Sequence, residues 1–387
     1  MKLPIDLKAV IEAATDIESA RNTPVSVSVL IDDSAPGDVA AHVRSAFVGA
    51  GAHARVTVGY FVGPAFSPYE GDDMAVIVAG FSEEVGRRAA EIRAAGVPVM
   101  VVTSVPRLVA DMASAYGNPI PEGDLVAPEG VEGCEADGDA ACTSGEVAGA
   151  HVGVLAGIRA AKSAGTGAAA GSSGAAASSP DVSDAPILID AAAAAALDRR
   201  MGEWVVAVCR EKRLALALSF PFVRRPLSLE AVSATSLQNA GIGLVLFIPG
   251  ADMPLMTLNQ AKMLLQIAAA YGEPMSVARV KELAAIVGGA FACRSVARQV
   301  AGAVPAIGCA VKAGVGYAGT KAMGLAAVEY FERGGNIAGL AGVVSTATAK
   351  ATQIAGDVAA TPAGARVLST VKTAVRQGAA SILKKTE

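Results

Sequence analysis

The chain has 387 residues; 52% of them are hydrophobic and 42 are glycine, but only 4% are aromatic. Small apolar side chains in this proportion are typical of helices that pack closely, either in a protein core or at a membrane. Five cysteines without paired spacing argue against a disulfide framework, and three histidines are too few for a zinc site of ordinary spacing.

The net charge of −4 conceals two oppositely charged halves. Residues 1–187 hold 24 acidic and 11 basic side chains, whereas residues 188–387 hold 12 acidic and 21 basic ones. A basic, apolar half is attracted to anionic lipid headgroups. Nucleic acid is the rival partner, but interleaved aromatic residues for base stacking are missing from this half, so we expect no nucleic-acid binding.

Residues 1–126 alternate strands and helices. The strands are expected at 25–31, 54–62, 73–80 and 97–103, and the helices at 38–48, 82–96 and 105–115. Apolar strands that alternate with helices predict a parallel sheet covered on both faces. The first residues, "MKLPIDLKAVIEAATDIESARN", lack the apolar core of a signal peptide, so we expect this half in the cytoplasm.

The rest of the chain changes character twice. Residues 127–186 are an acidic, Gly/Ala/Ser-rich insertion with a flexible linker. Residues 187–335 predict a helical domain, and residues 336–387 a basic, Ala-rich tail. The helices are expected at 187–218, 229–248, 254–271, 276–302 and 306–333.

Nucleotide chemistry is absent where an α/β domain would carry it. The first strand–helix turn offers Asp32, Asp33 and Asp38, which repel phosphate, and no lysine occurs between Lys8 and Lys162. A Walker-type lysine and a guanine-reading Asn-Lys-x-Asp are therefore missing. We expect neither GTPase nor ATPase activity, no catalytic residues, no cofactor and no metal.

Two kinds of chemically capable residue have a structural interpretation. The acid pairs Asp32/Asp33 and Asp72/Asp73 could bind a metal at strand ends, but caps and solvated turns are the favoured interpretation. Cys209 lies on an apolar helical stretch, as does Cys293, and both are expected to be buried as small hydrophobic residues.

The longest uncharged stretch, residues 231–251, is interrupted at its apolar end. Pro249, Gly250, Asp252 and Pro254 follow one another within six residues, which predicts a hinge between two half-length helices. Asp252 is expected to cap the second helix. The pair predicts a helical hairpin, either in a soluble core or re-entering a bilayer.

Two further sets of residues suggest contacts of the helical domain. Small residues recur at every fourth position, which predicts a helix-packing strip: Ala306, Ala310, Gly314, Ala318 and Ala322. Arg294 and Arg298 lie one helical turn apart; they form a solvated face or, as the second interpretation, contact acidic headgroups.

Residues 190–334 resemble the family called domain of unknown function 697, which occurs in YcjF-like bacterial membrane proteins. The motifs that carry the resemblance are "REKRLALALSFPFVRR", "NAGIGLVLFIPGADMPLMTLNQAK" and "GYAGTKAMGLAAVEYFE". The resemblance implies a helical domain behind a Ras-like GTPase domain, here in a degenerate form without its P-loop. It implies no established activity.

Together these features predict a non-enzymatic protein of two domains. The α/β domain would bind a protein partner, and the helical domain would associate with the cytoplasmic side of the cell membrane, peripherally or partly inserted. The alternatives are an atypical nucleotide-binding switch, which would bind through backbone amides at residues 32–38, and a soluble cytoplasmic scaffold.

Overall fold

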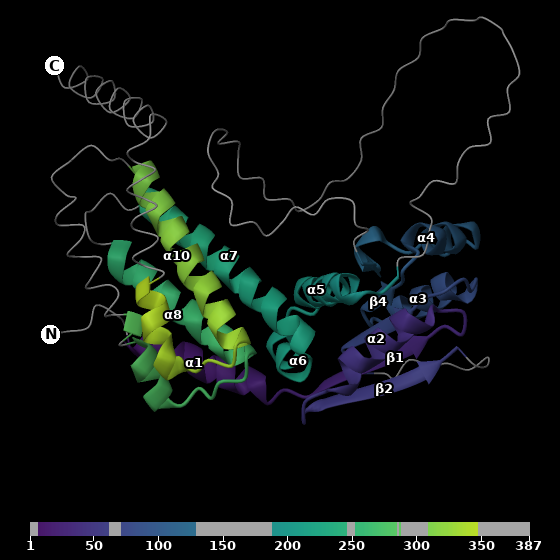
Figure 1. The fold of residues 1–387 in the computed structure, drawn as a ribbon, viewed down its shortest axis with the longest axis horizontal. Coiled ribbons are helices and arrows are strands. Elements are labelled where there is room, and N and C mark those ends of the chain that lie inside the picture. The colour runs from purple at the N-terminus through teal and green to yellow at the C-terminus, as the bar shows by residue number, and fades with distance from the viewer. Residues whose placement is uncertain are drawn as a thin grey trace, which may run out of the picture.

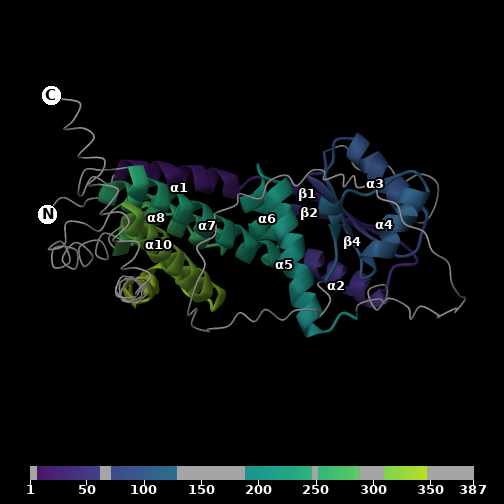
Figure 2. The same cartoon turned by 90° about the horizontal axis from the view of Figure 1, so that it is seen from above.

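The computed structural model describes residues 7–61, 71–128, 188–245, 252–284, 286–287 and 309–346. Figure 1 shows a sheet with its covering helices at one end of the molecule and a group of longer helices at the other. The view from above in Figure 2 separates these two parts along the same long axis.

Five parallel strands form one sheet in the order β2-β1-β3-β4-β5. They are β1 (Val25–Ile31), β2 (Ala54–Tyr60), β3 (Met74–Val78), β4 (Val99–Val102) and β5 (Leu125–Val126). The predicted parallel sheet and its four predicted strands are confirmed. This order belongs to doubly wound folds, which bind ligands beyond the carboxyl ends of the strands where the order reverses. The reversal lies between β1 and β3.

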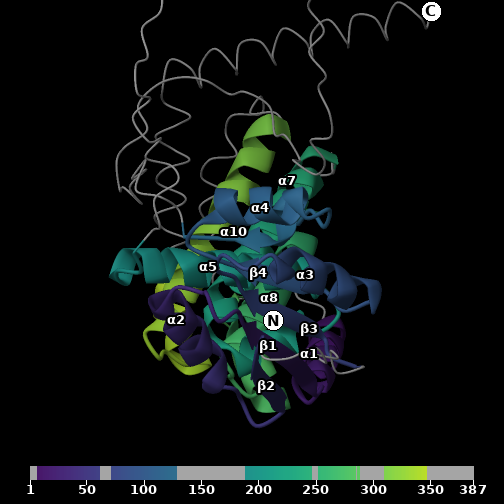
Figure 3. The ribbon, with the colours of Figure 1, turned by 90° about the vertical axis from the view of Figure 1, so that its right-hand side faces the viewer.

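The inner strands are apolar because helices cover them on both sides. Every residue of β3 and of β4 is buried, as is all of β1 except Ser26. Helices α2 (Gly37–Val48) and α5 (Ala191–Val208) share a core with one face, and α3 (Glu84–Ala94) and α4 (Pro106–Ala115) share a core with the other. Figure 3 shows α2 and α3 on opposite sides of the strands.

Helix α5, which the prediction places in a helical domain of residues 187–335, packs on both sides: against the sheet core and against the long helix α7 (Pro221–Val245). Its apolar stripe, with Leu197 and Met201, is fully buried in the same core as β1 and α2. His42 of α2 lies 2.8 Å from the Asp198 carboxylate, and the Arg200 guanidinium donates to the Ala127 carbonyl at 3.0 Å. We use "α/β module" for strands β1–β5 with helices α2–α5.

Helix α1 (Leu7–Arg21) packs against the long helices and not against the sheet. It was expected with residues 1–126, but Val10 and Ala14 are buried in the core of the long helices. The Arg21 guanidinium donates to the carbonyls of Gly272 at 2.9 Å and Glu273 at 3.1 Å. We use "helical module" for this helix with α6 (Arg213–Ser219), α7 (Pro221–Val245), α8 (Asp252–Ala270) and α10 (Cys309–Glu332).

Helix α7 begins eight residues before the predicted start at residue 229 and contains Pro226. Proline has no N–H to donate, so the carbonyl of Phe222, four residues earlier, loses its helical partner. Gly202 of α5 lies against this carbonyl: a Cβ atom on Gly202 would be 2.5 Å from the oxygen. The proline is tolerated at the place where α5 approaches α7 most closely.

One of the hydrophobic cores extends across both modules. The ring of Phe47 in α2 contacts those of Phe220 and Phe222, with centroids 4.9 and 5.2 Å apart. Lys212, which precedes α6, pairs with Asp73 at 2.7 Å. The start of α7 is therefore fixed to the sheet.

Cys209 follows α5 and is buried, as predicted. Burial, and to a lesser extent the nearby Asp73 carboxylate, raises the pKa of its thiol to about 12. The side chain is thus a neutral, apolar group at neutral pH. Cys293 lies outside the described residues.

The predicted boundary between helical domain and tail, after residue 335, falls inside a packed segment. Asn336 caps the short helix η3 (Ile337–Gly339) by accepting from the Gly339 N–H at 3.1 Å. Ile337, Leu340 and Val344 are fully buried against the helical module. The remainder of the predicted tail and the predicted insertion, apart from residues 127 and 128, lie outside the described residues.

Candidate functional site

Asp32 lies at the carboxyl end of β1, next to the reversal of strand order. It is only 3% exposed. Its carboxylate accepts hydrogen bonds from the N–H groups of Ser34 at 3.2 Å and Gly80 at 2.9 Å, and from the Ser34 hydroxyl at 2.8 Å. The N–H of Ser82 contributes a longer contact of 3.4 Å. One carboxylate therefore holds the loops after β1 and β3 together.

The two loops touch at a position that only glycine can occupy. A Cβ atom on Gly80 would lie 2.2 Å from the carbonyl group of Ser34. The next residue, Phe81, donates its N–H to the Ser34 hydroxyl at 2.7 Å. The crevice at the reversal of strand order is thus closed around Asp32.

This closure bears on nucleotide binding. Doubly wound proteins use backbone N–H groups at this edge to bind phosphate. Here the carboxylate of Asp32 already accepts from the N–H groups of Ser34 and Gly80, so a phosphate would have to displace a buried internal anion. Asp32 is therefore a turn residue, as interpreted, but it is buried and not solvated.

The second acid pair directly precedes β3 and so lies at the amino-terminal end of the strands, opposite to Asp32. Asp72 accepts from the Ser26 hydroxyl at 2.5 Å and pairs with Arg55 at 3.1 Å. Asp73 pairs with Lys212 and accepts from the Ser26 N–H at 2.9 Å. Both carboxylates have protein partners, and the described part of the chain holds no cluster of three or more His, Cys, Asp or Glu able to bind a metal.

The second candidate region is the end of the helical module that lies away from the sheet. Helix α7 ends there, and α8 and α10 begin there. Asn239 of α7 contacts Met256 of α8 and Thr320 of α10, which places these positions of the three helices at one level. We call this end the tip and define it as residues 236–245, 252–260 and 309–321.

A buried polar network joins the three helices of the tip. Asn239 donates to the Thr320 hydroxyl at 2.9 Å and accepts from the Asn259 amide at 3.0 Å. Gln260 donates to the same hydroxyl at 3.0 Å, and Thr320 donates to the Gly316 carbonyl at 2.7 Å. The hydroxyl uses its one proton and both lone pairs. Such a saturated network fixes the register of the helices.

The structure describes only part of the predicted packing strip. Ala306 lies outside the described residues, and the side-chain surroundings of Ala310 and Gly314 are not described. Ala318 and Ala322 are half-buried.

Among the glycines of α10 in the described residues, Gly316 and Gly324 approach α7 most closely. They are displaced by two positions from Gly314 and Ala322 of the predicted strip. A Cβ atom on Gly324 would lie 2.4 Å from a methyl group of Val232, and one on Gly316 would lie 3.2 Å from the Asn239 carbonyl. Two positions correspond to a rotation of about 200° around a helix. These two glycines allow close packing of α10 on α7, whereas the packing role of the predicted strip itself stays a prediction.

Gly324→Ala is expected to lower the free energy of unfolding by about 1–3 kcal/mol, because the added methyl group overlaps Val232. Gly319→Ala on the same helix is the matched control. No atom lies within 4 Å of its added methyl group, so this change should stabilise by about 0.4–1 kcal/mol. Urea unfolding followed by circular dichroism measures both. Changes of the same sign would contradict the assignment of the contact face.

The structure places only part of the predicted hinge. Pro249 and Gly250 lie outside the described residues, as do Arg294 and Arg298. Helix α8 begins at Asp252, and Pro254 is its third residue. The side-chain contacts of Asp252 are not described, so its role as a cap stays a prediction.

Large apolar side chains are exposed at the tip. Leu237 of α7 is 57% exposed, Leu255 of α8 is 44% exposed and Tyr317 of α10 is 37% exposed. The Lys321 ammonium lies over the Tyr317 ring, 5.6 Å from its centroid. An exposed aromatic residue beside a lysine is typical of side chains at a membrane interface.

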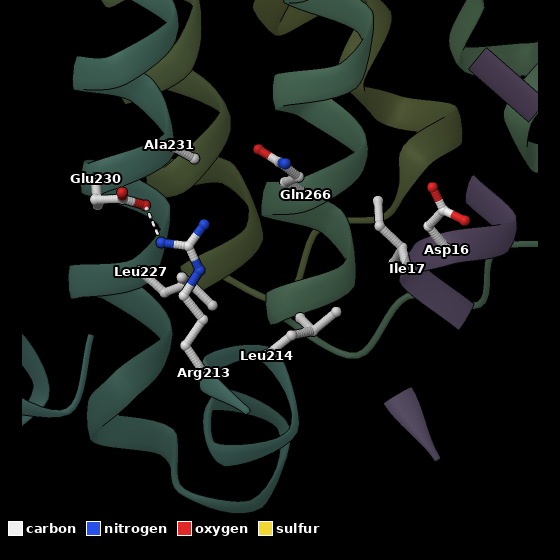
Figure 4. Close-up of a pocket in the computed structure, with 8 residues that line it drawn as sticks. All are labelled: Asp16, Ile17, Arg213, Leu214, Leu227, Glu230, Ala231 and Gln266. Atoms are coloured by element: carbon white, nitrogen blue, oxygen red, sulfur yellow. Dashed lines mark hydrogen bonds and ion pairs between the residues drawn. The ribbon is translucent and has the colours of Figure 1, made fainter. Parts of the chain in front are cut away.

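A small pocket of about 210 Å³ lies at the opposite end of the helical module, near the sheet. Figure 4 shows Glu230 and Arg213 on one wall, joined by an ion pair of 3.1 Å, with Asp16 on the other. Leu214 on its floor packs against both hydrophobic cores. The volume is below the roughly 300–1,000 Å³ of ordinary ligand pockets, and the lining defines no substrate class.

Comparisons of the chain with protein-family models, with curated proteins and with solved structures find no match. The resemblance to family 697 therefore stays an expectation from sequence motifs. Among the helices that the structure describes, none has the length and apolarity to cross a bilayer.

Proposed function

We propose that this chain is a non-enzymatic, membrane-associated protein on the cytoplasmic side of the membrane. The tip of the helical module contacts the lipid surface, and the α/β module, a degenerate GTPase-like domain, binds a protein partner. The observation that carries the proposal is the exposure of Leu237, Leu255 and Tyr317 at the tip, the end of the helical module away from the sheet.

The sequence between α7 and α8 also supports contact of the tip with the lipid surface. The segment from Leu246 to Ala251 reads "LFIPGA" and carries no charge. It joins helix ends that already expose Leu237 and Leu255. Burial of one leucine side chain contributes about 1.5–3 kcal/mol, so a few such residues suffice for reversible attachment. Lys321 adds attraction to anionic headgroups.

The α/β module is assigned a binding role because its phosphate-binding edge is self-occupied. Asp32 engages the amides at the reversal of strand order, and the loop carries no lysine. The competing proposal, a nucleotide switch, predicts heat on mixing the protein with GTP or ATP and Mg²⁺. Titration calorimetry at high micromolar protein that detects binding would replace the partner-binding role with that switch.

Vesicle flotation tests the membrane contact. The full chain should float with vesicles of phosphatidylcholine and phosphatidylglycerol, and less with phosphatidylcholine alone. Leu237→Ser combined with Leu255→Ser should weaken binding by at least about tenfold, because two apolar side chains lose their burial. Val48→Ser, which changes a 66% exposed apolar residue of α2, should leave binding unchanged.

A soluble scaffold predicts a different result. The full chain would then stay with the soluble fraction at low salt whatever the vesicle composition. That outcome, in a protein whose circular dichroism shows normal helix content, would overturn the membrane contact.

A further inference from the structure

Strand β2 forms one edge of the sheet, and its pairing shows which backbone groups point outward. Within the described residues it pairs with β1 alone. The Val25 N–H donates to the His53 carbonyl at 3.0 Å, and the Phe61 N–H donates to the Ile31 carbonyl at 3.1 Å. Because parallel bonds alternate evenly, the odd-numbered residues of β2 face β1. The backbone groups of Val56, Val58 and Tyr60 therefore point away from the sheet.

Among the described residues this edge carries little of the usual protection against pairing, because β2 has neither lysine nor proline. Natural edge strands carry lysine, proline, a bulge or an inward-pointing charge. β2 reads "ARVTVGY" and has one charged residue, Arg55. The Arg55 guanidinium donates to the Ser26 hydroxyl at 2.7 Å and pairs with Asp72, so it is turned toward the sheet. Val58 is 37% exposed and Tyr60 is 49% exposed. Figure 1 shows β2 on the outer border of the sheet.

We infer that β2 pairs with β2 of a second copy of this chain. Two identical edges can meet about a twofold axis only in antiparallel orientation. The register centred on Val58 uses all three outward-facing residues: Val58 opposes Val58 of the second copy, and Val56 opposes Tyr60. Two five-stranded sheets become one ten-stranded sheet.

The side chains in this register are self-complementary. The apolar pairs Val58–Val58 and Val56–Tyr60 form on the face that carries α2, where Val56 already packs against the core. Cross-strand pairs of aromatic and β-branched residues are favourable in sheets. On the other face Thr57 opposes Gly59, and Arg55 opposes Phe61 of the second copy. No two like charges oppose each other, so this register brings no charge repulsion between the paired strands.

A charge exchange at residue 58 tests the pairing. The full chain should show a concentration-dependent monomer–dimer equilibrium in sedimentation velocity. Val58→Lys and Val58→Glu should each be monomeric at concentrations at which the unmodified protein is mostly dimeric, because each places two like charges directly opposite each other. An equimolar mixture of the two variants should dimerise again, since residue 58 then faces its opposite charge. Val48→Lys, on the exposed end of α2, should dimerise normally.

Each result decides the inference. Circular dichroism melts of both variants identify loss of fold, and Val58→Thr, which keeps a β-branched side chain without charge, should remain dimeric. A protein that is monomeric at all concentrations overturns the inference, as do variants that dimerise like the unmodified chain. Monomeric variants that do not pair in the mixture overturn the register centred on Val58. Because the test uses no lipid, its outcome is independent of the membrane contact.

Discussion

Asp32→Ala is expected to lower the free energy of unfolding by about 2–4 kcal/mol. The change leaves the N–H groups of Ser34 and Gly80 without their acceptor, and Gly80 is fully enclosed between two loops. A buried donor that loses its partner costs about 1–3 kcal/mol. Single domains have total stabilities of about 5–15 kcal/mol, so the loss is a large part of the whole.

The neighbouring residue supplies the control for this prediction. Asp33→Ala removes the same charge from an exposed position and should change stability by less than about 0.5 kcal/mol. Guanidinium unfolding monitored by circular dichroism at neutral pH compares the two variants with the unmodified protein. Equal effects of the two substitutions would contradict the structural role of Asp32.

Thr320→Val is expected to have the second large effect and to lower the free energy of unfolding by about 2–4 kcal/mol. The substitution keeps the shape of the side chain but removes the oxygen that accepts from Asn239 and Gln260. Both amides then lose an acceptor inside a core that water does not reach. Because the network joins α7, α8 and α10, the loss should also speed hydrogen exchange along these three helices.

Thr346→Val is its matched control. The Thr346 hydroxyl also donates to the carbonyl four residues earlier, at 2.9 Å, but it is exposed. Its replacement should change stability by less than about 0.5 kcal/mol. A similar loss for both variants would show that the local helix bond of Thr320, and not the network, carries its contribution.

Local pattern was enough to predict the sheet. Strands such as "MAVIV" of β3 are apolar on both faces, which occurs only where helices cover a sheet on both sides. The two-residue β5 is too short for any periodicity. Its place in the sheet follows from pairing with β4, which is a long-range property.

Assignment of helices to modules could not be predicted in the same way. The apolar stripes of α1 and α5 show that each helix packs against something, but a stripe does not identify its partner. Nearness in sequence groups α1 with the strands and α5 with the later helices, whereas α1 packs on α8, and α5 packs on both the sheet core and α7. The contacts that fix these helices include ion pairs and hydrogen bonds between residues that are distant in sequence, such as His42 with Asp198.

The polar network of the tip is not predicted from the sequence. Asn239, Asn259 and Gln260 stand out as polar residues in apolar surroundings, and their meeting with Thr320 depends on the register of three helices. The contact face of α10 was harder still. Small residues occur on several sides of this helix, so spacing alone does not distinguish Ala318 and Ala322 from Gly316 and Gly324.

The packing of α1 and α5 against residues distant in sequence has a consequence for synthesis on the ribosome. Arg21 bonds to a carbonyl 252 residues further along the chain, and at about 5–20 residues per second that partner emerges roughly 10–50 s later. Throughout this interval Val10 and Ala14 have no core to enter. The core on one face of the sheet likewise stays incomplete until α5 has been synthesised. Neither module can finish folding before most of the chain has been made, so the nascent protein offers its first helix to chaperones before its own partner exists.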